Sequence, residues 1–300
     1  MLSIIICSRN KSLGEAFTEN IKNTVGVDYE IIAVDNSENQ YSIFSAYNIG
    51  FAQSNYPYVC FVHEDVLFHS FNWGERVIAH LQNPSIGIVG VAGGDLVTRV
   101  PASWANLISR GQNVILSDSV SKKPTKHLLE PENYNQQERS SITIDGLFMC
   151  MRQELMRKIH FDEDLKGFHG YDYDISIQSI VAGYTNCVIY DISLEHFSKG
   201  KTDIVYFRNL ISIYKKWESY LPLIGKNITK NECLKIPTIE EKKIYQLTKK
   251  MVRKGFEVTE ITSEINYYAN IIGSKRAVLF LKFRIFLIRL FNCPKYIFSK

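Results

Sequence analysis

The stretch Tyr58-Val59-Cys60-Phe61-Val62, followed by His63-Glu64-Asp65, decides the fold of this chain. Five apolar residues in a row are typical of a strand that is buried on both faces of a parallel sheet. Three ionisable side chains after such a strand would cost several kcal/mol if they stayed in the core. We therefore expect them at the carboxyl end of the strand, where open α/β sheets bind ligands.

This triplet also suggests a ligand. One imidazole and two carboxylates suit a divalent cation together with a phosphate-bearing molecule. A polar cluster that caps the following helix is the alternative interpretation.

Apolar segments alternate with amphipathic, helix-like segments through about the first 200 residues, which favours a doubly wound, mainly parallel α/β sheet. The expected strands are residues 3–7, 29–34, 58–62, 86–91, 142–151 and 185–191. The expected helices are residues 12–24, 41–53, 73–82, 152–159 and 174–183. Residues 100–141 are polar and irregular, which predicts a long functional loop or lid. Because the periodicity is helical from about Asp203 onward, we predict an α/β domain over residues 1–205 and a helical region over residues 206–300.

The charge of the chain is unevenly distributed. Its 300 residues are 45% hydrophobic and 22% charged, as in ordinary globular proteins. The net charge is +4, but no acidic residue follows Glu264, whereas seven lysines and arginines do. Without those seven, 28 basic residues stand against 31 acidic ones. A slightly acidic body argues against binding to nucleic acid.

The six cysteines lie far apart, without a C-x-x-C pair, and several sit in strand-like apolar segments. This pattern predicts a reducing compartment, with no disulfide framework and no structural zinc. The first residues predict a strand, without the basic and apolar regions of a signal peptide. We therefore expect a cytoplasmic protein.

Other polar residues follow expected strands. Ser8 and Arg9 end the first strand and Asp35 follows the second, where a carboxylate can accept from a sugar hydroxyl or a base N–H. Plain caps or an Asx turn are the alternatives. Asn48 and Gly50 precede the third strand and predict either a close approach of the backbone to a ligand or a helix end. No G-x-G-x-x-G and no P-loop follows the first strand, which argues against dinucleotide-binding enzymes and P-loop NTPases.

A second informative segment is Gly167-Phe168-His169-Gly170-Tyr171-Asp172-Tyr173-Asp174. A carboxylate among aromatic side chains can have a raised pKa and serve as a general base, the role we predict for Asp172. Asp174 is expected to complement the N-terminus of the following helix, and both carboxylates doing so is the alternative. His196 follows a strand end and is either a ligand or a structural histidine.

In their order and spacing, these segments resemble the GT-A glycosyltransferases, in particular the inverting family-2 group that uses nucleotide-diphosphate sugars. His63-Glu64-Asp65 stands at the D-x-D metal motif of that group, and residues 170–174 stand at the glycine-glutamate-aspartate-x-aspartate motif that carries the base. The other matching segments are residues 3–10, 34–37, 48–52 and, on the acceptor side, 145–148. His63 replaces the first aspartate and Tyr171 the glutamate, although a related bacterial branch is similar in having histidine-x-aspartate here.

The resemblance implies a metal-assisted, inverting transfer of a sugar from a nucleotide-diphosphate donor to a glycan or lipid-linked acceptor. It implies Asp172 as the base. Asp65, His63 and His196 would hold the cation, and imidazole suits Mn²⁺ better than Mg²⁺. The residues expected at the donor nucleotide are Ser8, Arg9, Asp35, Asn48 and Glu64. A sugar-phosphate nucleotidyltransferase and a non-catalytic nucleotide- or carbohydrate-binding protein are the alternatives, although residues 8–14 contain only one glycine for the former.

The C-terminal segment, residues 271–300, is apolar but interrupted by basic residues, which disfavours a membrane-spanning helix. Lys275, Lys282 and Arg289 repeat every seven residues and fall on one side of a helix. Such a cationic helix suits an anionic membrane surface, here the inner face of the membrane. A helix packed on the α/β domain is the alternative.

Overall fold

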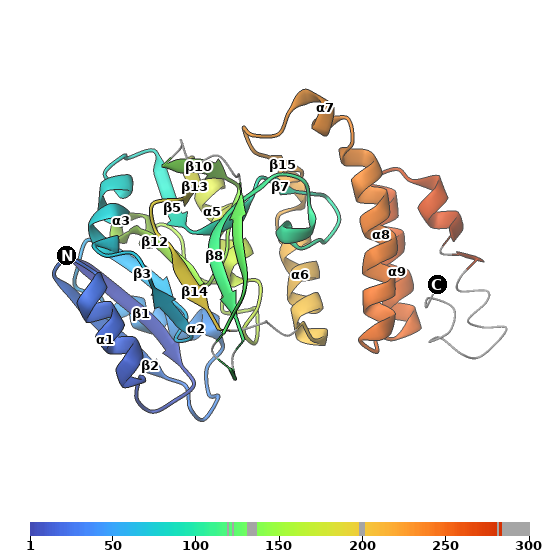
Figure 1. Ribbon diagram of the computed structural model, residues 1–300. Helices are drawn as coiled ribbons and strands as arrows, with labels where there is room; N and C mark the ends of the chain where they lie inside the picture. The colour runs from blue at the N-terminus through green and yellow to red at the C-terminus, as the bar shows by residue number, and fades with distance from the viewer. Residues whose placement is uncertain (119, 122, 131–136, 198–201, 281, 284–300) are drawn as a thin grey trace.

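The computed structural model describes residues 1–118, 120–121, 123–130, 137–197, 202–280 and 282–283. Its main sheet has seven strands in the order β10-β13-β5-β12-β3-β1-β2 (Figure 1). These strands are β1 (Leu2–Ser8), β2 (Tyr29–Asp35), β3 (Tyr58–Val62), β5 (Ile86–Gly90), β10 (Glu138–Ser141), β12 (Phe148–Arg152) and β13 (Thr185–Ile189). All but β10 and β12 run in one direction. The expected α/β fold with a mainly parallel sheet is confirmed.

Helices cover this sheet because its central strands are apolar on both faces. The helices of this part are α1 (Glu15–Thr24), α2 (Ile43–Ala52), α3 (Trp73–Leu81), α4 (Gln153–Met156) and α5 (Tyr171–Val181). Gly50 lies inside α2, where an added Cβ would stand 2.4 Å from a side-chain carbon of Ile5 on β1. The glycine therefore permits close packing of helix on sheet.

A second sheet has the strand order β11-β6-β8-β14-β4, and β9 pairs with β8 outside that path. Its strands are β4 (Val66–Phe68), β6 (Ala92–Gly94), β8 (Arg110–Ser117), β9 (Pro124–Glu130), β11 (Thr143–Ile144) and β14 (Leu194–His196). The prediction of an irregular loop over residues 100–141 is therefore wrong, since β8, β9 and β10 lie in it. β8 is held by pairing with β9, β6 and β14, and such long-range pairs leave little trace in a polar sequence.

The single strand expected over residues 142–151 is also wrong. The chain pairs β11 with β6 in the second sheet, turns at Asp145, and then enters the main sheet as β12. Asp145 itself accepts a hydrogen bond from the backbone N–H of Leu147, at 3.1 Å. An Asp-Gly pair is a turn signal, which here outweighs the apolar pattern on either side.

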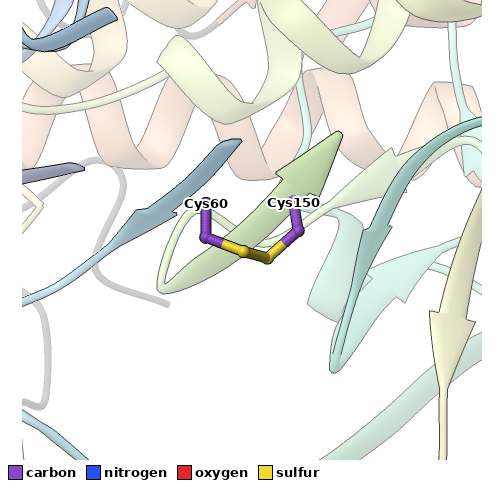
Figure 2. The surroundings of a disulfide bond; sticks show 2 residues. All are labelled: Cys60 and Cys150. Carbon is purple, nitrogen blue, oxygen red and sulfur yellow. A yellow bond between two sulfur atoms is a disulfide. The ribbon is translucent and has the colours of Figure 1, made fainter. Parts of the chain in front are cut away.

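The expectation of a chain without disulfides is wrong as well, because Cys60 and Cys150 are joined (Figure 2). Antiparallel pairing of β3 with β12 sets the two residues directly opposite each other, with Cα atoms 4.1 Å apart. Both cysteines are fully buried. The two positions are 90 residues apart in sequence, so only the strand register reveals the pair.

The chain continues into helices after residue 203. These are α6 (Ile204–Lys216), α7 (Lys230–Cys233), α8 (Ile236–Arg253) and α9 (Val258–Ile271), with the short strands β7 (Leu96–Val97) and β15 (Leu223–Ile224) forming a separate pair. Single turns of 3₁₀ helix lie at Trp104–Asn106 and Glu218–Tyr220. Figure 1 shows α6 between the sheets and the α8–α9 pair. The apolar face of α6 is buried in the same core as the sheets.

The expected cationic tail lies mostly outside the described residues. Residues 275–280 are helical, and residues 284–300 are not described. Among the residues that are described, no helix combines the length and the apolar character needed to cross a membrane.

Candidate active site

Three of the predicted ligand residues converge from two sheets. His63 and Asp65 follow β3 of the main sheet, and His196 ends β14 of the second. One ligand atom from each lies within 4.8 Å of the others. His196 Nε2 is 3.4 Å and His63 Nδ1 is 3.9 Å from Asp65 Oδ1. The structure therefore brings together all three residues predicted to bind a metal, which we call the His-Asp-His cluster.

The protonation states in this cluster suit a cation. Burial by itself raises the pKa of Asp65, but the adjacent His196, then His63 and Arg9, outweigh it and lower the pKa to about 2. Burial, and next the neighbouring His196, lower the pKa of His63, so its imidazole is neutral at pH 7. A carboxylate and a neutral imidazole are the forms that bind metals.

The surroundings of His196 test whether these three residues fit a metal ion. Its Nε2 is buried and has no well-formed hydrogen bond among the described residues, although it faces Asp65. A buried nitrogen whose nearest acceptor is not in good hydrogen-bonding geometry is costly and calls for an explanation. A cation between His196, His63 and Asp65 supplies one, and two nitrogens with one carboxylate oxygen suit Mn²⁺ better than Mg²⁺.

The residues predicted at the nucleotide separate into two groups. Glu64 accepts hydrogen bonds from Ser8 Oγ at 2.8 Å and Arg9 Nε at 2.7 Å, so its carboxylate ties the end of β1 to the end of β3. The Arg9 side chain is 71% exposed, and its guanidinium lies 3.9 Å from Asp65. Arg9 can therefore reach an anion beside the cluster, whereas Glu64 is occupied by the protein.

Asp35 and Asn48, the other two residues predicted at the nucleotide, have different surroundings. Asp35 ends β2 in register with Ser8, is exposed, and accepts from the backbone N–H of Ser37 at 2.9 Å, which is an Asx turn. That backbone hydrogen bond is the main reason its pKa is lowered. Asn48 on α2 donates to the carbonyl of Phe161 and to Glu163, both at 2.8 Å. The structure shows no contact of Asn48 with the cluster.

Asp172 lies in the first turn of α5 and is partly buried. Burial, and next the charge of Asp145, raise its pKa to about 7. A carboxylate with that pKa is well matched to accept a proton near neutral pH. Asp145 belongs to this site. Its segment, residues 145–148, was matched to the acceptor side of the family, but Asp145 itself was given no role. The turn signal of Asp145-Gly146 inside an apolar segment could have marked the residue.

Tyr171 precedes Asp172 on α5 and contacts one of the predicted metal ligands. Its hydroxyl lies 2.6 Å from His63 Nε2. With the proton on Nε2, His63 donates to Tyr171 and directs its Nδ1 lone pair toward Asp65. The substitution noted in the sequence, tyrosine for glutamate, therefore fixes the orientation of the histidine that replaces aspartate.

Gly146 makes room for Tyr171, because an added Cβ would lie 2.1 Å from the tyrosine hydroxyl. We expect Gly146→Ala to displace Tyr171, to lower the free energy of unfolding by about 1–3 kcal/mol, and to weaken Mn²⁺ binding. Thermal unfolding and a Mn²⁺ titration measure the two effects. Gly14→Ala is the matched control, since nothing lies within 4 Å of that position. Unchanged Mn²⁺ affinity in Gly146→Ala would show that Tyr171 does not position His63.

Asp174 has a different environment from Asp172. It is 1% exposed, accepts from Trp217 Nε1 at 2.8 Å, and pairs with Lys216 at 2.9 Å. Its contacts with Trp217 and Lys216 tie α5 to the end of α6, so its role is structural.

We expect Asp174→Asn to lower the free energy of unfolding by about 1–3 kcal/mol, because a buried carboxylate loses its charge-assisted partners while Lys216 keeps Asp162. Urea unfolding measures this change. If stability were unchanged and turnover lost, the roles assigned to Asp172 and Asp174 would be reversed.

Residues 3–200 match the family described as "Glycosyltransferase like family". The chain belongs to this glycosyltransferase-like family. The match confirms the GT-A type of fold and ends shortly before α6.

Among solved structures, the fold is similar to "Crystal structure of GalNAc-T7 with UDP, GalNAc and Mn2+", with 11% identity, a TM-score of 0.49, and coverage of 78% of this chain and 53% of that one. The chain thus spans about half the length of that protein. A second similar structure is "Crystal Structure of A197 from STIV", with 15% identity, a TM-score of 0.39, and coverage of 66% and 86%. No curated protein matches the sequence.

Proposed function

We propose that this member of the glycosyltransferase-like family is an inverting enzyme with its catalytic domain in residues 1–205. It would transfer a sugar from a nucleotide-diphosphate donor to a hydroxyl of a glycan or lipid-linked acceptor. The observation that carries this proposal is that Tyr171, the residue before Asp172 on α5, contacts His63 of the His-Asp-His cluster. A cation site and a base with a pKa of about 7 are the two groups that such a transfer needs.

The His-Asp-His cluster would hold the divalent cation, and that cation offsets the charge that develops on the leaving nucleoside diphosphate. Arg9 is exposed beside the cluster and carries a positive charge toward the same diphosphate. Ser8 and Glu64 hold Arg9 and the end of β1 in place. Asp35, at the neighbouring strand end, is exposed and its side chain keeps acceptor capacity for a ribose hydroxyl or base N–H.

Asp172 would take the proton of the acceptor hydroxyl as that oxygen attacks the anomeric carbon. The bond to the nucleoside diphosphate breaks on the opposite face, so the configuration of the sugar is inverted. Burial and, next, the charge of Asp145 keep Asp172 ready to bind the proton, since both raise its pKa.

A thermal-shift screen against nucleotide sugars, with and without Mn²⁺, tests this function. A donor should raise the melting temperature only with the cation, because binding stabilises the folded state by mass action. Release of nucleoside diphosphate from the same donor then separates an enzyme from a non-catalytic binding protein. If no donor binds in either condition, the proposal fails.

We further propose that the protein is cytoplasmic, where complete burial keeps the bond between Cys60 and Cys150 away from soluble thiols. Residues 271–300 would attach the protein to an anionic membrane surface and so give access to a lipid-linked acceptor. We expect full-length protein to float with anionic liposomes, less so at high salt, because basic side chains bind the headgroups. Deletion of the residues after Ser274 should abolish flotation. Equal recovery of both proteins in the unbound fraction would assign the segment to packing.

A further inference from the structure

A narrow cleft lies between α6, α8 and residues 101–106. Its wall includes Ser103, Asn106, Tyr206, Phe207, Lys243 and Lys250. Its interior is small, so it suits the end group of a ligand rather than a whole sugar ring.

Lys243 lines this cleft and is only 6% exposed. Its Nζ donates to the carbonyl of Asn106 at 2.8 Å and to Gln246 Oε1 at 3.1 Å, both neutral. Within the described part of the chain no carboxylate forms an ion pair with it. A buried lysine is almost always paired with an anion, and an unpaired one is costly.

Lys250 follows seven residues later on the same face of α8 and is more exposed. Its ammonium lies 5.7 Å from the centre of the Phe207 ring, and it too has no acidic partner among the described residues. Burial, and next the charge of Lys250, lower the pKa of Lys243, so the two cations disfavour each other. By contrast, Lys215 and Lys216 on the adjacent α6 are both paired with carboxylates.

The cleft lies close to the helix that carries the candidate base. Tyr173, next to Asp172 on α5, donates to the carbonyl of Ala102 in the cleft wall at 3.1 Å. Tyr206 belongs to the same wall, and burial, then the charge of Asp172, raise the pKa of its hydroxyl to about 12. One side chain of the cleft wall therefore lies within electrostatic reach of Asp172. Tyr171, the residue before Asp172, contacts His63 of the His-Asp-His cluster.

We propose that Lys243 and Lys250 bind a phosphate group of the acceptor, so that an acceptor hydroxyl is held at Asp172. This inference rests on the proposed function, because it names the acceptor class for the same base. A phosphate supplies the counter-charge that the two lysines lack, and lysine binds phosphate as a point charge. A phosphorylated glycan and a lipid-linked phosphate present the same chemistry to this cleft.

The direct test is binding of inorganic phosphate to the full-length protein, with chelator present and ionic strength held constant with chloride. We expect phosphate to raise the melting temperature of the wild type, and Lys250→Met to weaken phosphate binding at least about tenfold, since a charge-assisted contact is lost. Lys243→Met should abolish the phosphate effect and should melt higher than the wild type in chloride alone. Lys242→Met, an exposed lysine on the same helix, is the control and should bind phosphate as the wild type does.

Equal phosphate affinity in the wild type, Lys243→Met and Lys250→Met would overturn the proposal. If Lys243→Met, the variant at the buried position, does not fold, the comparison of Lys250→Met with the wild type is sufficient. Vesicles containing phosphatidic acid, compared with soluble phosphate, separate the two sources. If Lys250→Met binds both the vesicles and soluble phosphate more weakly than the wild type, the ligand is a lipid-borne phosphate. If only its binding to soluble phosphate is weaker, the ligand is a phosphorylated glycan. Because no donor is used, phosphate binding without any donor binding would leave this site intact and refute the proposed function instead.

Discussion

Asp172→Asn is expected to lower kcat by about 10²-fold or more while leaving donor affinity nearly unchanged. The substitution keeps the shape and one acceptor oxygen but removes the group that takes the proton. Steady-state kinetics with the donor found in the screen measure the change. Retention of wild-type kcat would exclude Asp172 as the base.

The raised pKa of Asp172 also predicts how kcat/KM depends on pH. Because Asp172 must be deprotonated to act, kcat/KM should fall about tenfold per pH unit below its pKa, which is about 7 without a cation. A bound cation adds positive charge near Asp172, which lowers its pKa and shifts this fall in kcat/KM, the acid limb of the pH profile, to lower pH. The acid limb should be absent from the residual activity of Asp172→Asn.

The stability of Asp172→Asn shows whether a loss of kcat comes from the missing base or from unfolding. The pKa of Asp172 is higher in the folded protein than the ordinary value of 3.8. The folded state therefore binds the proton more tightly, and stability falls as pH rises from about 4 to about 7. Asparagine has no charge to desolvate, so above pH 7 Asp172→Asn should be at least as stable as the wild type. An unstable variant would indicate a structural role instead.

Asp65→Ala is expected to abolish cation-dependent donor binding and to lower turnover by at least about 100-fold, since even residues that only orient a metal ligand are worth 10–100-fold. The fold should persist, because the Asp65 side chain lies at the mouth of β3 and is partly exposed. His63→Ala should have a smaller effect, since Asp65 and His196 remain. Activity and its response to chelator are the measurements.

Glu64→Gln is a suitable control for Asp65→Ala. It sits next to Asp65 but holds Ser8 and Arg9 rather than a cation. It should keep the response to chelator while weakening donor binding through Arg9. Unchanged turnover and chelator response in Asp65→Ala would refute the assignment of the cation site.

The sequence predicted those parts of the site that depend on buried strands. β1 and β3 are apolar enough to be recognised alone, and parallel strands place their carboxyl ends together, so Ser8, Arg9, His63 and Asp65 were expected as neighbours. His196 was also expected near them. Its position follows from the pairing of β14 with β4, because β4 begins directly after Asp65.

The parts that were missed depend on pairing between distant segments. β8 and β9 are polar strands that exist because they pair with each other and with the second sheet. The bond between Cys60 and Cys150 follows from a strand register that spacing does not reveal. Asp145 was placed inside a strand, because apolar residues on either side concealed the turn.

Two side chains show where residue type alone misleads. Asn48 lies in the segment that resembles the family, yet its amide binds Phe161 and Glu163. Tyr171 departs from the family motif, yet it holds His63. In both cases the partner is about 110 residues away, and only the folded chain shows it.

In the proposed function, the His-Asp-His cluster holds a divalent cation on the diphosphate of a donor. Electron paramagnetic resonance of Mn²⁺ tests it most directly, with the purified protein titrated in the presence of UDP, GDP, CDP or dTDP. We expect one Mn²⁺ bound per chain with at least one of these nucleotides, retained in Asp172→Asn and lost in Asp65→Ala. Mn²⁺ that stays free with every nucleotide, or that binds Asp65→Ala as tightly as the wild type, would contradict it.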